Sequence, residues 1–284
     1  MPIAQLPPAV TLVLAGVAGL LIGSFLNVVI HRLPRMLERG WQAQCAELAG
    51  DAPAALPAYN LVVPRSQCPS CGHLIGALEN IPVVSYLVLR GRCAACKAPI
   101  SARYPLVELL AAALAAMAVW QFGATATALA ACVFLWSLLA LTFIDFDTQF
   151  LPDNITLPLL WVGLLTHVWG LFPAVSLREG VIGAVAGYLS LWTIYWLFKL
   201  IRGKEGMGYG DFKLLAALGA WLGWKMLLPI IALSSLAGAL IGIALMAFRG
   251  RDHQLPFAFG PYLAIAGAIA LFSGQRLVGI YLPG

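Results

Sequence analysis

Long apolar runs alternate with short polar breaks over most of the chain. The first run covers residues 9–30, and seven more lie near residues 105–120, 124–144, 155–171, 181–201, 212–222, 226–248 and 257–274. A helix of about 20 apolar residues can cross a bilayer. The pattern therefore predicts an all-α polytopic membrane protein. The expected number of transmembrane helices is eight, give or take one, because the run at 212–222 is short.

One long polar stretch, residues 31–104, follows the first run. It is rich in cysteine, proline and basic residues, and it has little helical periodicity. Its Pro and Gly content predicts turns and short strands. We therefore expect three parts: a first transmembrane helix at 1–30, a small soluble insertion domain at 31–104, and a membrane domain of about seven helices at 105–284.

Composition agrees with a membrane protein and excludes a soluble one. The chain is 61% hydrophobic and 10% charged, whereas soluble domains carry about 25% charged residues. The net charge of +5 could suggest nucleic-acid binding. We exclude that function because the basic residues lie at the ends of apolar runs and around the cysteines and form no basic stripe.

The charge distribution also predicts an orientation. The first run lacks a basic segment before it and is too long for a signal-peptide core, so it should be an uncleaved helix. If the N-terminus is periplasmic, all but three of the 17 Lys and Arg residues fall on the inner side; the exceptions are Arg178, Lys225 and Arg276. This bias fits the positive-inside rule. It predicts that the cysteine-rich stretch is cytoplasmic.

Four cysteines in the polar stretch form two C-x-x-C pairs, at Cys68 and Cys71 and at Cys93 and Cys96. Such pairs can supply the four thiolates of a tetrahedral zinc site, which would be closed and therefore structural. Two disulfides or a redox pair are the alternatives. They are disfavoured because disulfides seldom persist in the cytoplasm and because a thioredoxin-type site has one pair. His73 is a weaker candidate to replace one cysteine.

Two aspartates are the main candidates for chemistry. Asp145 lies at the end of the third apolar run and Asp211 at the start of the sixth, both on the predicted inner side. Carboxylates beside lipid are costly and rare. As a pair they could share one proton, one removing a proton from water while the other donates to a peptide carbonyl. The glycines at 206–210 would let the backbone unwind and admit an extended peptide.

Other interpretations of these carboxylates stay open. Both aspartates could be solvated helix-end residues. Asp147 competes with Asp145 as the acid of the third run. Glu108, one turn into the second run, is a further membrane carboxylate that could instead form a structural ion pair with a basic residue such as Arg103.

Several motifs of other enzyme classes are missing from the sequence. There is no His-Glu-x-x-His, which disfavours a zinc metalloprotease. There is no Gly-x-Ser-x-Gly, and the four histidines are scattered, which leaves a serine protease without support. No Walker A motif is present either.

Nearly the whole chain resembles the bacterial prepilin peptidases (type IV leader peptidases) of the long, bifunctional form. Besides the two cysteine pairs, the resemblance rests on sequence blocks at residues 23–34, 80–86, 103–108, 145–153, 206–213 and 259–263. The last two read GMGYGDFK and FGPYL.

The resemblance implies an inner-membrane enzyme that cleaves the leader from type IV prepilins and type II secretion pseudopilins at the cytoplasmic face. It implies that the enzyme then methylates the new N-terminal residue, usually Phe, with S-adenosylmethionine. In the family pattern the first catalytic aspartate precedes Leu-Pro by six residues, which selects Asp145 over Asp147; the second is Asp211 of Gly-x-Gly-Asp. The resemblance also links the domain at 31–104 to methylation, because short-form relatives without this domain generally lack that step. Residues that bind the methyl donor are not indicated.

Two alternatives to this function remain. The first is a zinc-stabilised membrane scaffold or transporter that uses the aspartates as ion or proton ligands. The second is a peptidase without transferase activity, whose zinc domain only recruits the substrate.

Overall fold

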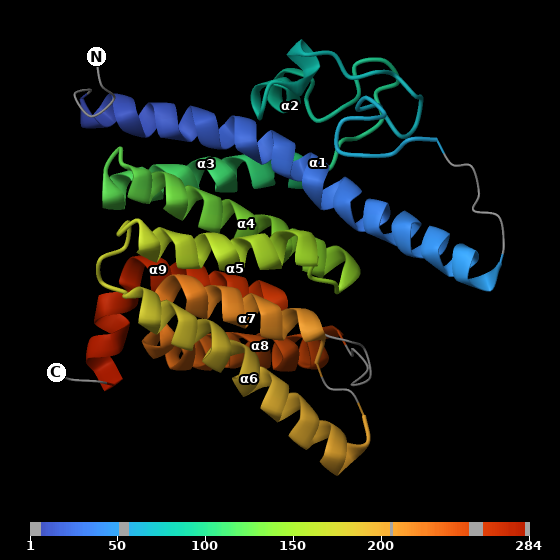
Figure 1. Ribbon diagram of the computed structural model, residues 1–284. Coiled ribbons are helices and arrows are strands. Elements are labelled where there is room, and N and C mark those ends of the chain that lie inside the picture. Colours follow the sequence, from blue (N-terminus) through green and yellow to red (C-terminus); the bar gives the residue numbers. More distant parts are fainter. Residues whose placement is uncertain (1–6, 51–56, 205–206, 250–257, 282–284) are drawn as a thin grey trace. The chain divides into compact units, whose positions relative to one another are not determined.

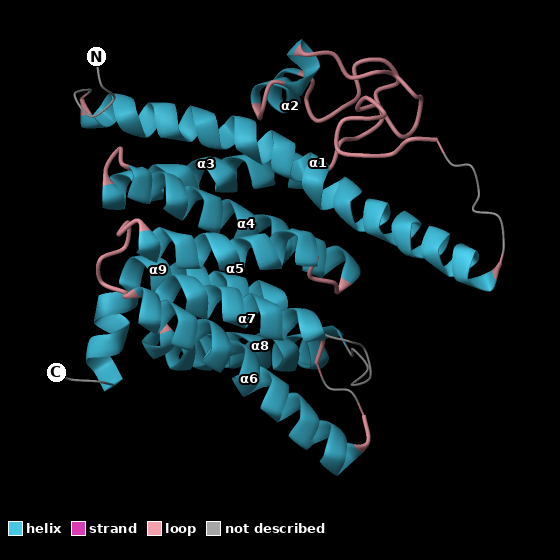
Figure 2. Cartoon of the chain, in the orientation of Figure 1, coloured by secondary structure: helices cyan, strands magenta, loops and turns pink. Residues whose placement is uncertain are grey.

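The computed structural model describes residues 7–50, 57–204, 207–249 and 258–281 (Figure 1). Regular structure in these residues is helical (Figure 2). The helices are α1 (Pro8–Ala49), α2 (Val84–Val88), α3 (Arg103–Phe122), α4 (Ala126–Thr148), α5 (Asp153–Val168), α6 (Leu177–Arg202), α7 (Tyr209–Leu222), α8 (Leu227–Arg249) and α9 (Gly260–Tyr281). The prediction of an all-α protein is confirmed. Short strands were expected in the polar stretch, but its described residues form only two isolated β-bridges.

Each of the eight apolar runs forms one long helix. Five helices among the described residues are long and apolar enough to cross a membrane: α1, α3, α4, α6 and a helical segment at Trp224–Ala244. Helices α5 and α7 have 16 and 14 residues, fewer than the roughly 20 that span a bilayer. Helix α9 is apolar over Gly260–Gly274. Gly206 of the glycine-rich block and Phe257 of the last run lie outside the described residues.

The first helix extends beyond its apolar run. It was expected to end at residue 30, yet α1 continues to Ala49 and ends at Gly50, which takes the left-handed conformation typical of a helix end. The expectation of little helix in residues 31–49 was therefore wrong. Apart from Pro34 and Gly40, this segment contains mostly good helix formers, so it needs no apolar face to stay helical.

The chain divides into two compact units, residues 1–132 and residues 133–284. In the first unit, α1 packs along α3 with two glycines at the contact. A Cβ at Gly19 would lie 2.6 Å from the Ala112 Cα, and a Cβ at Gly23 would lie 2.6 Å from the Glu108 Cα. Small residues allow membrane helices to approach this closely.

The polar segment after α1 is held against the same helix. The buried Arg32 guanidinium donates to the Asn60 carbonyl (2.9 Å) and to the Pro64 carbonyl (2.7 Å). Asn27 of α1 also donates to the Tyr104 carbonyl at the start of α3 (3.1 Å).

In the second unit α7 forms the centre of the packing. Every residue from Phe212 to Leu222 except Lys213 is buried. Helix α7 contacts α5, α6 and α9. Gly219 meets Gly183 of α6 backbone to backbone, and the Trp221 indole donates to the Leu159 carbonyl of α5 (2.7 Å). This packing fixes the first turn of α7, which carries Asp211.

Candidate active site and metal centre

Asp211 lies in the first turn of α7, as the sequence predicted. The helix begins after Gly208, which has extended backbone angles, and Asp211 is buried (7% exposed). A carboxylate is favoured at this end of a helix because the macrodipole is positive there. Two residues later, the Lys213 ammonium forms an ion pair with Asp153 (2.7 Å) and so connects the start of α7 to the start of α5.

Asp145 lies near the end of α4 and is buried (5% exposed). The Gly260 backbone hydrogen-bonds the carboxyl group, but its Oδ2 atom has no hydrogen-bond partner among the residues that the structure describes. Most buried polar atoms in proteins have such a partner, so an exception calls for an explanation. One explanation is that this oxygen is left available to bind a group of the substrate.

The two aspartates approach each other around Leu151. A Cβ at Gly260 would lie 2.7 Å from the Asp145 Oδ2 and 3.1 Å from Leu151, while a Cβ at Gly210 would lie 2.8 Å from the same leucine. The two carboxyl groups are near enough to interact electrostatically. Segments from α4, α7 and the start of α9 therefore converge on one site.

Asp147 has a different environment. It is exposed, whereas Asp145 is buried. Because two residues turn a helix by about 200°, the two side chains point to different sides of α4. The burial pattern supports the choice of Asp145 over Asp147.

An aromatic cluster borders Asp211. Tyr195 of α6 is buried, and its ring lies 5.2 Å from the Tyr209 ring and 5.7 Å from the Phe212 ring, centroid to centroid. Tyr195 could not be recognised from the sequence, because an aromatic residue inside an apolar run gives no signal of its own. Gly260 was recognised only as part of a sequence block, and its approach to Asp145 is visible only in three dimensions.

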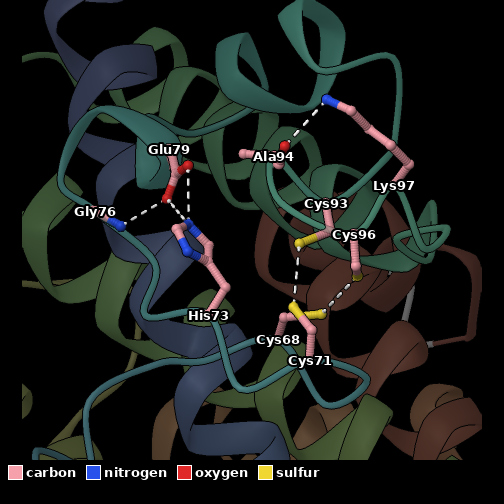
Figure 3. A network of polar contacts seen from close by, with 9 residues as sticks. All are labelled: Cys68, Cys71, His73, Gly76, Glu79, Cys93, Ala94, Cys96 and Lys97. Atoms are coloured by element: carbon pink, nitrogen blue, oxygen red, sulfur yellow. Dashed lines mark hydrogen bonds and ion pairs between the residues drawn. The ribbon is translucent and has the colours of Figure 1, made fainter.

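The four cysteines of the C-x-x-C pairs come together, as expected (Figure 3). All four sulfurs lie within 4.8 Å of one another. The Cys68 and Cys96 sulfurs are 3.8 Å apart, and those of Cys71 and Cys93 are 4.0 Å apart. Tetrahedral zinc with Zn–S bonds of about 2.3 Å places its sulfurs about 3.8 Å apart. The donor set and its spacing fit a closed zinc site.

The two cysteine pairs have the same backbone. After each second cysteine the chain takes a left-handed residue, Gly72 (φ 73°) or Lys97 (φ 60°). The amide of that residue donates to the carbonyl of the first cysteine of its pair, at 2.9 and 3.1 Å. The β-bridges Gln67–Leu74 and Arg92–Pro99 close the two turns. We call these two turns the knuckles.

Electrostatics at the first knuckle favour metal binding. Hydrogen bonds from the Ser70 and Cys71 backbone amides lower the pKa of the Cys68 thiol to about 6. For Cys71, a hydrogen bond from the His73 backbone acts to lower the pKa of the thiol. Hydrogen bonds with Cys96 and the other thiols, together with burial, outweigh it and raise this pKa to about 12. Thiolates are the form that binds metal, so a cation would stabilise the fully deprotonated set.

His73 has a different partner. Its Nε2 atom lies 3.0 Å from the Glu79 carboxylate, which also accepts from the Gly76 amide (2.8 Å). The hydrogen bonds from Gly76 and His73 lower the pKa of Glu79. The described contacts therefore place this histidine outside the sulfur cluster. Cys45 and Cys132 also lie outside it.

Glu108 faces the polar segment of the first unit. It is buried (8% exposed), and its Oε2 accepts from the Val83 amide (2.8 Å). It also forms a hydrogen bond with Ser24. Among the described residues these contacts include no Lys or Arg, so the expected pairing with a base such as Arg103 is not found.

Comparisons with known proteins cover both units. Residues 17–122 match the model of the bacterial peptidase A24 N-terminal domain, and residues 132–243 match that of the type IV leader peptidase family. No solved structure gives a significant match.

Several curated relatives carry the name prepilin leader peptidase/N-methyltransferase. One from Aeromonas hydrophila is 59% identical over 93% of this chain and 91% of its own length. One from Pseudomonas aeruginosa is 56% identical over the same shares, and one from Stutzerimonas stutzeri is 53% identical over 97% and 95%. At this identity and coverage, the chain belongs to the type IV leader peptidase family.

Proposed function

We propose that this chain cleaves the leader peptide from type IV prepilins and related pseudopilins, and then methylates the new N-terminal residue with S-adenosylmethionine. The observation that carries the peptidase half is the convergence of two buried carboxyl groups, one with an oxygen that has no described partner. The names of the relatives support both halves. They do not favour a transporter or scaffold.

In the proposed cleavage, Asp145 and Asp211 share one proton. Two like charges this close in an apolar environment do not both ionise easily. The ionised carboxylate takes a proton from water, which attacks the scissile carbonyl while the protonated carboxyl donates to the carbonyl oxygen. The proton then passes to the leaving amine, and no covalent enzyme intermediate forms.

We further propose the bacterial inner membrane as the location, with the aspartates and the knuckles on the cytoplasmic side. The positive-inside bias supports this orientation. Zinc at Cys68, Cys71, Cys93 and Cys96 would be structural, because four protein ligands leave no open coordination position.

Replacing either aspartate by asparagine should abolish cleavage. Asp145→Asn and Asp211→Asn each remove a group that must donate or accept a proton, so we expect cleavage of a purified prepilin in detergent to fall by about 10²–10⁴-fold. Asp147→Asn is the matched control and should cleave at the wild-type rate. Wild-type rates for either of the first two variants would refute the assignment.

Gly260→Ala should also impair cleavage. The added Cβ would lie 2.7 Å from the Asp145 Oδ2, so the carboxyl must shift, and a displacement of about 1 Å can cost about 10²-fold in rate. Gly242→Ala is the control because its Cβ would meet nothing within 4 Å. Equal cleavage rates for the two variants, measured on prepilin, would show that Gly260 does not position Asp145.

Metal analysis tests the knuckles. Purified protein should contain about one zinc per chain, and Cys68→Ser or Cys93→Ser should remove it. Cys45→Ser, at an exposed cysteine outside the cluster, should keep it. Elemental analysis after dialysis against EDTA gives the count, and full zinc content in both knuckle variants would exclude the site.

A further inference from the structure

The first unit contains a cavity of about 640 Å³. Its walls come from α1, α2, the start of α3 and the knuckle segment. Cys68 and Cys93, the buried cysteines of the two knuckles, line it together with His73 and Glu79. Figure 3 shows these four side chains. Sites for small molecules and cofactors typically measure about 300–1,000 Å³. The cavity lies wholly within the first unit and includes neither aspartate of the proposed peptidase site.

The cavity wall carries both signs of charge. Glu79 and Glu108 are acidic, and Arg32, Arg35 and Arg65 are basic. Arg32 already donates to two backbone carbonyls. A wall with charges of both signs suits a zwitterionic ligand better than an apolar molecule.

Among these charged groups, Glu108 gives the clearest indication of the charge of the ligand. It is a buried carboxylate whose described contacts are the Val83 amide and Ser24. Burying a carboxylate without a compensating cation is costly. A ligand with positive charge would supply the compensation that the described side chains do not.

The backbone that Glu108 holds is strained. Val83 has φ 59° and ψ −46°, and the Val84 amide donates to the Pro82 carbonyl. These features define a classic γ-turn, which is rare, and a β-branched residue makes it costlier still. Such strain persists only where the surroundings enforce it and concentrates around ligand sites. The turn leads directly into α2, which contributes Ser85 and Tyr86 to the cavity wall.

Three tyrosines also line the wall: Tyr59, Tyr86 and Tyr104. The Tyr59 ring is fixed by Arg39, whose guanidinium carbon lies 4.3 Å from the ring centroid. A nucleobase can stack on a tyrosine ring of this kind.

We propose that this cavity is the binding site for S-adenosylmethionine, an inference that rests on the transferase half of the proposed function. Glu108 faces the cationic sulfonium end, Arg35 binds the methionine carboxylate, and Tyr59 or Tyr86 stacks on the adenine. The knuckles form one wall, so zinc shapes this site without joining the reaction.

The transfer itself needs only a neutral amine and the donor. The free α-amine of the new N-terminal residue attacks the methyl carbon, and the N–C bond forms as the C–S bond breaks. The sulfur keeps the electron pair and becomes a neutral thioether. The methylated amine, now positively charged, releases a proton to solvent.

The test is ultraviolet cross-linking of tritiated S-adenosylmethionine to the full-length protein in detergent, followed by mapping of the labelled peptide. The label should fall within residues 24–35 or 59–108, the two stretches that line the cavity. Glu108→Gln should reduce labelling at least ten-fold at a fixed donor concentration. The glutamine amide oxygen can still accept from Val83, so the γ-turn is kept while the charge is lost. Glu47→Gln, an exposed acid outside the cavity wall, is the control and should label like wild type.

A second pair of variants tests the volume of the cavity. Ser85→Trp fills it from α2, whereas Val88→Trp adds the same side chain at an exposed position outside its wall. Only the first should lose labelling. Prepilin cleavage, measured on every sample, reports that the protein is folded.

The outcomes separate this inference from the function on which it rests. A label that maps outside residues 24–35 and 59–108, or wild-type labelling in both Glu108→Gln and Ser85→Trp, overturns the site even if methylation is active. A wild-type protein that cleaves prepilin but neither binds nor uses the donor overturns the transferase function together with the site.

Discussion

The burial of two carboxyl groups at the ends of apolar helices is the constraint on which the second unit depends. Asp145 and Asp211 are 5% and 7% exposed, and keeping both so deep costs free energy that the surrounding packing must offset. The glycine contact between α6 and α7 and the Trp221 hydrogen bond to α5 hold α7 in place. Gly260 leaves room for the Asp145 carboxyl. The packing of α7 thus holds the Asp211 carboxyl group at a fixed position near the Asp145 carboxyl group.

The first unit is stabilised in a different way. Its polar segment has little regular structure among the described residues, so a few strong interactions hold it in place. Arg32 binds two of its carbonyls, Glu108 binds the Val83 amide, and the two knuckles bring four sulfurs together. These interactions enclose a cavity with charged and aromatic walls. In the proposed function the sulfur cluster would hold a structural metal beside this cavity, which in turn would bind the small charged donor.

Much of this arrangement could be predicted from the sequence. Apolar runs predicted the helices because hydrophobic length is a strong local signal, and the C-x-x-C spacing predicted the sulfur cluster because a knuckle is a local turn. The extension of α1 to Ala49 was missed, since the polar segment offered no apolar periodicity. The roles of Gly260 and Glu108 could not be predicted, because each depends on a neighbour far away in the sequence.

The central claim is that cleavage and methylation use separate sites, one in each unit. The most direct measurement offers Asp211→Asn a synthetic mature pilin peptide with a free N-terminal Phe, together with labelled S-adenosylmethionine, and follows methylation of the peptide by mass spectrometry. The account predicts methylation at close to the wild-type rate, although this variant cannot cleave a prepilin. Loss of methylation in a folded, zinc-containing Asp211→Asn protein would contradict it and would place both reactions at one site.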